Sequence, residues 1–410
     1  MKLLPHFLLA LALAFTANSI ASAAPAKTGA SSSRPVAKKT PAKSKAANKT
    51  VNKTTAKTVN KAPPSRPAPA RIDYAGEQVN FTDWKAVNDF ADEVALRHGF
   101  PRDELRALFA QARFVDSAVQ LVKPAPVGKP KNMNAVRRLM IEPVRINAGI
   151  RFWNEHADTL ARAEAEFGVP ADIIVGIIGI ETVYGRNTGR FRVVDVLTTL
   201  GFAYPEAPNK AARMAFFRGE LENTLLLARK LSIDPFSLLG SFAGAVGLPQ
   251  FMPGSILAYA VDFDGDGAID LRGSPRDAIG SVANFLVKHG WKREQNGPAV
   301  YQAIVSPGRE WEKFLGQGLE AKFNAEQLRS AGVATTAPLP AARSYSLVDL
   351  HNGADVAEYW VSTNNFYAIT HYNRSYYYAM SVLELGRAVQ LAMAAGPAGT
   401  GRPSSSMESK

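Results

Sequence analysis

The apolar positions of the chain follow a helical period over most of its length. One helical face starts near Phe81 and carries Trp84, Val87, Ala91, Val94 and Ala95. The Gly99-Phe100-Pro101 step should end this helix before a second one begins at Arg102. The same pattern predicts further helices over 146–167, 213–230 and 378–395.

Beyond Trp291 the apolar residues alternate, which is typical of strands. Short strands are predicted over 299–305, 344–350, 357–361 and 366–370. The expected fold class is therefore mainly α (α+β), with a helical body and a small β insertion near the C-terminus.

The segment 171–185 is almost wholly apolar, and the carboxyl group of Glu181 lies near its C-terminal end. Pro170 suits the first turn of a helix and Gly185 is a plausible stop. A helix without a polar face is usually buried, and burial favours the protonated carboxyl group. The negative end of the helix dipole has the same effect. Two interpretations weigh about equally here: a general acid, or a buried acid satisfied by hydrogen bonds.

The positive charge of the chain comes from one segment. The formal net charge is +12, yet residues 24–72 hold twelve Lys or Arg and no acidic residue. Without these twelve and Lys2, 35 basic and 36 acidic residues remain. A nearly neutral body argues against a nucleic-acid-binding fold. We expect 24–72 to be a disordered basic linker that acts as a tether, and binding to anionic polymers of the cell envelope is the alternative.

The N-terminus has the layout of a secretory signal peptide. Lys2 precedes an apolar stretch over 7–15, and small residues end it at Ala21-Ser22-Ala23. The chain has no cysteine, which excludes disulfides, thiolate metal sites and lipid attachment through a Cys. We therefore expect a signal peptide over 1–23, a periplasmic protein that is not a lipoprotein, and no transmembrane segment in the mature chain.

The segment from Asp262 to Asp270 matches the first nine positions of an EF-hand loop. The predicted metal ligands are Asp262, Asp264, Asp266, the backbone carbonyl of Ala268 and Asp277. Gly273 occupies the position of the usual closing acid, so Asp277 is the nearest residue that can close a lengthened loop. The prediction is a structural calcium site over 262–277, and the alternative is a metal-free Asp/Gly turn. No organic cofactor is expected.

Two other blocks suit carbohydrate. The segment 240–253 combines small residues with the side chains of Ser241 and Gln250. The segment 369–378 interleaves aromatic rings with amide and hydroxyl groups. Sugars present apolar faces and polar edges, which such side chains match. Each block alone is more often ordinary core or turn, but together they indicate a glycan site.

With these motifs in place, the chain resembles the lytic murein transglycosylase B family of peptidoglycan-cleaving enzymes. The resemblance rests on the run ending in Glu181, on the blocks 240–253, 280–284 and 371–378, and on the loop from Asp262. It covers about 81–395 and implies a lysozyme-like core with a helical lobe, a small β lobe at about 298–370 and calcium. The expected catalytic region is 73–395, followed by a disordered tail over 396–410.

The resemblance also implies roles for individual residues. Glu181 matches the sole catalytic acid and base of the family. The positions that match sugar-holding or acid-orienting residues are Ser241, Gln250, Tyr204, Tyr372, Asn373 and Tyr378.

The chain departs from the family pattern at three places. In the family a pair of arginines usually stands soon after the Tyr-Pro that matches Tyr204-Pro205. In this chain residues 206–210 intervene, and Arg213 is the best equivalent of that pair. Phe285 stands where a tyrosine is usual, and the calcium loop is one residue longer than usual.

The implied reaction is cleavage of the MurNAc-β-1,4-GlcNAc bond of peptidoglycan strands with formation of 1,6-anhydro-MurNAc ends. The sequence offers no second acid in a comparably apolar run, and Asp195 has Arg190 and Arg192 nearby as ion-pair partners. A single acid and base suffices if the muramyl 6-hydroxyl acts as the nucleophile. The alternatives are a lysozyme-type hydrolase and a non-catalytic, calcium-containing wall-binding protein.

Overall fold

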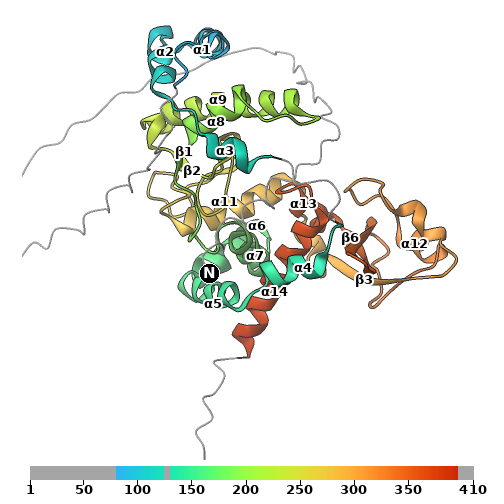
Figure 1. The fold of residues 1–410 in the computed structure, drawn as a ribbon. Helices are drawn as coiled ribbons and strands as arrows, with labels where there is room; N and C mark the ends of the chain where they lie inside the picture. The colour runs from blue at the N-terminus through green and yellow to red at the C-terminus, as the bar shows by residue number, and fades with distance from the viewer. Residues whose placement is uncertain (1–79, 124–129, 396–410) are drawn as a thin grey trace, which may run out of the picture. The chain divides into compact units, whose positions relative to one another are not determined.

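The computed structural model describes residues 80–123 and 130–395 (Figure 1). The predicted signal peptide, the basic linker and the tail over 396–410 lie outside the described residues. The helices of the described part are α1 (Lys85–His98), α2 (Arg102–Gln111), α3 (Asp116–Leu121), α4 (Met133–Met140), α5 (Pro143–Glu155), α6 (Ala157–Phe167), α7 (Ala171–Thr182), α8 (Val193–Phe202), α9 (Lys210–Leu231), α10 (Pro253–Tyr259), α11 (Pro275–Lys288), α12 (Ala325–Ser330), α13 (Asn364–Thr370) and α14 (Tyr376–Ala394). Three short 3-10 helices are η1 (Pro235–Ser237), η2 (Arg293–Gln295) and η3 (Glu310–Phe314).

The strands form two antiparallel sheets. The first pairs β1 (Phe191–Arg192) with β2 (Leu239–Gly240). The second has the order β4-β3-β6-β5 and contains β3 (Val300–Val305), β4 (Val333–Thr335), β5 (Tyr345–Asn352) and β6 (Asp355–Thr363). Tyr301, Tyr345, Leu347 and Val361 of this sheet pack with Trp311 and Phe314 in a core separate from that of the helices.

Most predicted elements are confirmed, and two predictions are wrong. The predicted helix over 146–167 is two helices, because the backbone of His156 leaves the helical conformation (φ −119°, ψ 25°) between α5 and α6. The predicted strand over 366–370 lies within helix α13. Four of its five residues are buried. Its buried and exposed positions therefore show neither the alternation of a strand nor the period of a helix, and the two cannot be told apart from the pattern. Strand β4 and helices α8 and α11 were not predicted.

Helix α7 packs against α14, and these two helices lie side by side in Figure 1. Glycines set their close approach. A Cβ at Gly176 would lie 2.3 Å from the carbonyl oxygen of Val382, and a Cβ at Gly386 would lie 2.1 Å from that of Asp172. The later residue of α7, Gly176, meets the earlier residue of α14, Val382, and Asp172 meets Gly386, so the two helices are antiparallel. The same register brings the end of α7 to the start of α14.

The interior of α7 is almost completely buried, as predicted, and it also contacts α5, α6 and α11. The helix ends at Thr182, three residues before the predicted stop at Gly185, because Val183 already adopts the left-handed conformation with φ 52°. Within the described ranges, no helix combines the length and apolarity that a membrane crossing requires.

Candidate active site

Glu181 is the penultimate residue of α7 and meets the first turn of α14. The hydroxyl group of Tyr378 donates a hydrogen bond of 2.6 Å to Oε1 of Glu181. Tyr378 is 2% exposed, so its ring is fixed by packing, whereas Glu181 is partly exposed. The acid is therefore held on one side by a buried tyrosine and remains accessible on another.

Burial of the carboxyl group raises the pKa of Glu181 to about 7, against a downward effect of the hydrogen bond from Tyr378. The pKa of Tyr378 is also raised, first by burial and then by the charge of Glu181. Tyr378 thus stays a hydrogen-bond donor at neutral pH. An acid with a pKa near 7 can both donate and accept a proton at that pH.

Tyr372 extends the surroundings of the acid. Its ring stacks beside that of Tyr378, with centroids 6.3 Å apart and planes 15° apart. Its hydroxyl group donates to the carbonyl oxygen of Pro249 at 2.8 Å. The charge of Glu181 is one cause of the raised pKa of Tyr372, after burial. The structure therefore brings the 371–378 block and the 240–253 block together beside Glu181.

The 240–253 block is also fastened to the end of α7. Thr182, directly after the acid, is fully buried and donates from Oγ1 to the carbonyl oxygen of Leu248 at 2.9 Å. Gln250 has a left-handed backbone (φ 50°), which is costly for a residue other than glycine. Its amide nitrogen donates to the carbonyl oxygen of Gly247 at 2.9 Å and to that of Thr188 at 3.4 Å. The turn around Gln250 is thus held from two sides.

Besides Tyr378, three further sequence-predicted site residues are more buried than direct contact with a large substrate requires. Ser241 is 4% exposed, and its hydroxyl oxygen accepts from the backbone nitrogen of Ala245 at 3.1 Å. Asn373 is 4% exposed and follows Tyr372. Tyr204 is 5% exposed and stacks on Phe217 at 5.8 Å. These side chains can shape and orient the site.

Arg213 belongs with Tyr204 in a second group. Its guanidinium carbon lies 6.0 Å from the centre of the Tyr204 ring, and the side chain is half-buried. Both residues sit where α8 and α9 meet, since Tyr204 follows α8 and Arg213 lies in the first turn of α9. Arg213 therefore accompanies Tyr204 at the α8–α9 junction, whereas Glu181 contacts Tyr378 of α14.

Sequence reasoning missed Arg145 of α5, which is fully buried behind the acid. Its Nη1 donates to the carbonyl oxygen of Gly179 at 2.6 Å and to that of Ile180 at 3.4 Å. A cation at the C-terminal carbonyls of a helix stabilises that end. Burial lowers the pKa of Arg145. A single arginine in an amphipathic pattern gives no signal of this role, because only the packing of α5 on α7 creates it.

Glu220 and Asp172 are desolvated as well, which corrects the view that Glu181 is alone in an apolar setting. Burial raises the pKa of Glu220 on α9 and of Asp172 on α7. Glu220 accepts a hydrogen bond of 2.8 Å from the backbone nitrogen of Gly254 and so caps α10. Its burial depends on the packing of α9 against α10, which the sequence pattern does not show.

The ion pair expected for Asp195 is confirmed with Arg192. Nε of Arg192 lies 2.6 Å from Oδ2 and Nη2 lies 3.0 Å from Oδ1 of the fully buried carboxylate. The backbone nitrogen of Arg113 donates to Asp195 as well, at 3.1 Å. Asp195 therefore acts as a structural anion.

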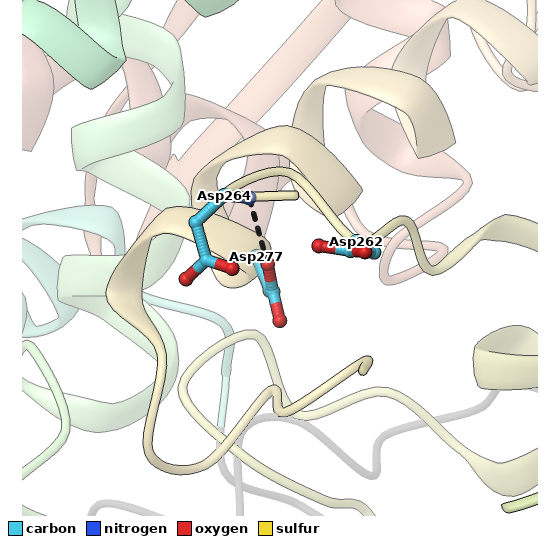
Figure 2. Close-up of side chains that lie close together, drawn as sticks. All are labelled: Asp262, Asp264 and Asp277. Atoms are coloured by element: carbon cyan, nitrogen blue, oxygen red, sulfur yellow. Dashed lines mark hydrogen bonds between the residues drawn. The ribbon is translucent and has the colours of Figure 1, made fainter. Parts of the chain in front are cut away.

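The loop from Asp262 gathers acids of a different kind. One carboxylate oxygen from each of Asp262, Asp264 and Asp277 lies within 4.8 Å of the others. Figure 2 shows the three side chains converging, with the backbone nitrogen of Asp264 bonded to Asp277. Asp277 also accepts from the backbone nitrogens of Phe263 and Asp270, each at 2.8 Å. Asp277 thus joins the start of α11 to both arms of the loop.

The loop fits a hard cation. The three clustered ligands are oxygens, as calcium prefers, and their negative charges oppose one another. The charge of Asp264 is one cause of the raised pKa of Asp277, although burial is the largest. Asp266, also expected as a ligand, lies outside this cluster, and its Oδ1 accepts from the backbone nitrogen of Ala268 at 2.8 Å. The cluster therefore contains three of the four predicted carboxylates.

Residues 81–387 match the family model described as the transglycosylase SLT domain. The chain is 42% identical over 321 residues to the membrane-bound lytic murein transglycosylase B of Escherichia coli, which covers 76% of this chain and 85% of that protein.

Several solved structures are similar to this chain. The Escherichia coli lytic transglycosylase Slt35 in complex with calcium has a TM-score of 0.68 and 40% identity, over 78% of this chain and 97% of that chain. SltB3 of Pseudomonas aeruginosa in complex with NAG-anhNAM-pentapeptide has a TM-score of 0.64 and 28% identity, over 76% of this chain and 80% of that chain.

Proposed function

The chain belongs to the transglycosylase SLT domain family and is a lytic transglycosylase of peptidoglycan, and we propose that Glu181 is its single acid and base. The observation that supports this role most directly is the position of Glu181 at the end of the buried helix α7, where the hydroxyl group of Tyr378 donates to it at 2.6 Å and burial raises its pKa to about 7. The protonated acid is then available at neutral pH. The hydrogen bond from Tyr378 supports the carboxylate that forms once the proton has left.

The reaction needs two proton transfers and no water. Protonated Glu181 donates its proton to the oxygen that links MurNAc C1 to GlcNAc, and that C–O bond breaks with its electron pair on the leaving oxygen. The 2-acetamido group stabilises the positive charge that develops at C1. The Glu181 carboxylate next removes the proton of the 6-hydroxyl group, whose oxygen bonds to C1. The products are a GlcNAc chain end and a 1,6-anhydro-MurNAc end, and Glu181 regains its proton.

Several side chains near the acid are proposed to bind the glycan. Gln250 and Tyr372 are partly exposed and lie at the junction of the two blocks, so direct contact with sugar is their proposed role. Ser241, Asn373 and Tyr204 are buried and are proposed to orient neighbouring groups. Arg213, beside Tyr204, is proposed to contact a more distant part of the substrate, such as a carboxylate of a peptide stem.

Calcium is proposed as a structural ion in the loop 262–277. Its ligands would be Asp262, Asp264, Asp277 and, after a change of rotamer, Asp266, with the carbonyl oxygen of Ala268. The relative Slt35 was solved with calcium, which supports the choice of ion. Bound there, calcium would neutralise the repulsion among the carboxylates, and none of the reaction steps involves it.

The proposed location is the periplasm, where the substrate is found. The predicted signal peptide supports this, and the related Escherichia coli enzyme is membrane-bound.

Digestion of purified sacculi followed by mass spectrometry tests the proposed reaction. Transglycosylation yields muropeptides one water lighter than the reducing fragments that a lysozyme-type hydrolase releases. Anhydro fragments are expected, in line with the anhydro sugar bound to SltB3. Reducing MurNAc ends as the main product would establish hydrolysis and contradict the proposal.

A further inference from the structure

A row of aromatic rings continues outward from Tyr372, and the reaction at Glu181 does not use it. The ring of Phe285 lies 4.7 Å from that of Tyr372 and stacks on His289 at 4.0 Å. His289 in turn lies 4.9 Å from His371. Each step is within the range of direct ring contact.

Two tyrosines flank the histidines. Tyr259 meets His289 edge to face at 4.8 Å, and Tyr367 meets His371 in the same way at 4.7 Å. Their rings come from three helices: Tyr259 ends α10, His289 follows α11, Tyr367 lies within α13, and His371 follows α13. We call Tyr259, His289, Tyr367 and His371 the outer aromatic row.

The outer aromatic row is accessible, unlike the core aromatics. His371 is exposed, and Tyr259, His289 and Tyr367 are half-buried, whereas the adjoining Phe285 is 6% exposed. Packing alone explains Phe285. It does not explain four polar-edged rings gathered at the surface beside the residues that hold the acid.

The hydrogen bonding of His289 defines what it can recognise. Its Nδ1 lies 2.8 Å from the carbonyl oxygen of Phe285, which can only accept, so Nδ1 carries a proton. In the neutral ring Nε2 is then an acceptor for a hydroxyl or amide N–H. Burial lowers the pKa of both His289 and His371, which favours the neutral form at pH 7. Ring faces combined with an acceptor match a pyranose or its N-acetyl group.

We propose that the outer aromatic row is an additional glycan subsite, which binds a saccharide unit of the strand beyond those held at Glu181, Tyr372 and Gln250. The proposal rests on the proposed function, because the strand must already lie at Glu181. Continuity of ring contacts from Tyr378 through Tyr372 and Phe285 to His371 favours the glycan as occupant. A peptide stem is the competing occupant, since Arg374 is near enough to influence His371.

The test compares peptide-free glycan strands of different length. Strands stripped of stems by an amidase are separated into a tetrasaccharide and strands at least twice as long, and kcat/KM is measured for each from the anhydro ends formed. The wild-type enzyme should prefer the long strands. In the double variant His371→Ala/Tyr367→Ala the preference should fall roughly five-fold or more, which corresponds to one or two lost aromatic contacts.

Two further variants separate ring loss from misfolding. His371→Tyr keeps a ring at the exposed position and should retain the long-strand preference within about two-fold, because the apolar face is preserved. His351→Ala removes an exposed histidine of β5, outside the outer aromatic row, and should change neither rate. Melting temperatures of all variants are measured in parallel.

An unchanged length preference in the double variant overturns the subsite while leaving the proposed function intact. Strands that still carry their peptide stems are assayed in parallel, and a loss seen only with these strands overturns the subsite in favour of peptide binding. Failure of the proposed function has a different signature, since the wild-type enzyme would then form no anhydro ends on any strand.

Discussion

Carboxylates occur in two contrasting surroundings in this molecule. At the junction of α7 and α14, Glu181 sits among apolar side chains with one tyrosine donor, and burial raises its pKa to about 7. In the loop 262–277, three carboxylates crowd within 4.8 Å and are tied down by backbone N–H groups. The first surroundings favour a proton on the acid, and the second favour a divalent cation between acids. The same functional group thus takes two roles through its neighbours.

The largest expected effect is at the apolar site. Glu181→Gln keeps shape and hydrogen bonding to Tyr378 but removes the transferable proton, so kcat on sacculi should fall by roughly 10³-fold. Glu220→Gln is the matched control, because the carboxyl group of Glu220 is also desolvated but caps α10, and the kcat of this variant should stay within a few-fold of wild type. An undiminished rate in Glu181→Gln would sink the assignment.

In the loop, the largest effect is expected from Asp277→Asn. One of its oxygens becomes an NH₂ group facing a backbone donor, so a hydrogen bond is lost and two donors oppose each other. The free energy of unfolding should fall by about 2–3 kcal/mol, measured by urea titration in chelator. Asp355→Asn, an exposed acid of β6, is the control and should be neutral. Equal stability of both variants would show that Asp277 does not hold the loop.

The raised pKa of Glu181 links stability to pH. The folded pKa of about 7 lies above the ordinary value of 4.5, so the stabilisation is complete below pH 4.5 and disappears as the pH rises through 7. Roughly 2 kcal/mol is expected, after allowance for the partial exposure of Glu181. The free energies of unfolding of wild type and Glu181→Gln are measured from pH 4 to pH 8.5. The difference between them should change by this amount across the range. Parallel curves would mean that Glu181 is already ionised in the acid range.

Calcium should stabilise the loop without changing the acid. At a calcium concentration ten times the dissociation constant, the gain is about 1.4 kcal/mol, and it is read as a rise in melting temperature over chelator-treated protein. Asp264→Asn should abolish the rise, and the control Asp355→Asn should keep it. A rise that survives in Asp264→Asn would place the ion elsewhere.

Tyr378→Phe should have the smallest effect. It removes the hydrogen bond that lowers the pKa of Glu181, so that pKa moves further up and the alkaline limb of the kcat–pH profile moves to higher pH. The carboxylate formed in the reaction also loses a donor, and kcat at neutral pH should fall about five-fold. If the alkaline limb of the kcat–pH profile moved to lower pH in Tyr378→Phe, the proposed effect of this hydrogen bond on the pKa of Glu181 would be wrong.

Many of the helices and strands could be predicted from the sequence, because each follows from the pattern of apolar and polar residues within its own segment. The all-apolar run identified α7 as buried, and the Asp/Gly spacing identified the loop 262–277. Where the pattern had no period, the prediction was wrong, as for the buried segment 366–370, which is helical. The break at His156 was also missed, since the apolar period continues across it.

The site itself needed the fold. From the order of residues alone, the available groups could be named: an acid near the end of an apolar helix, a tyrosine-rich block and an acidic loop. The packing of the helices was needed to show that Tyr378 donates to Glu181, that Arg145 supports the end of α7, and that Glu220 is a cap. The reason is physical. Periodicity records which side of an element is buried, whereas a hydrogen bond or a pKa depends on the atoms that another element brings within about 3 Å.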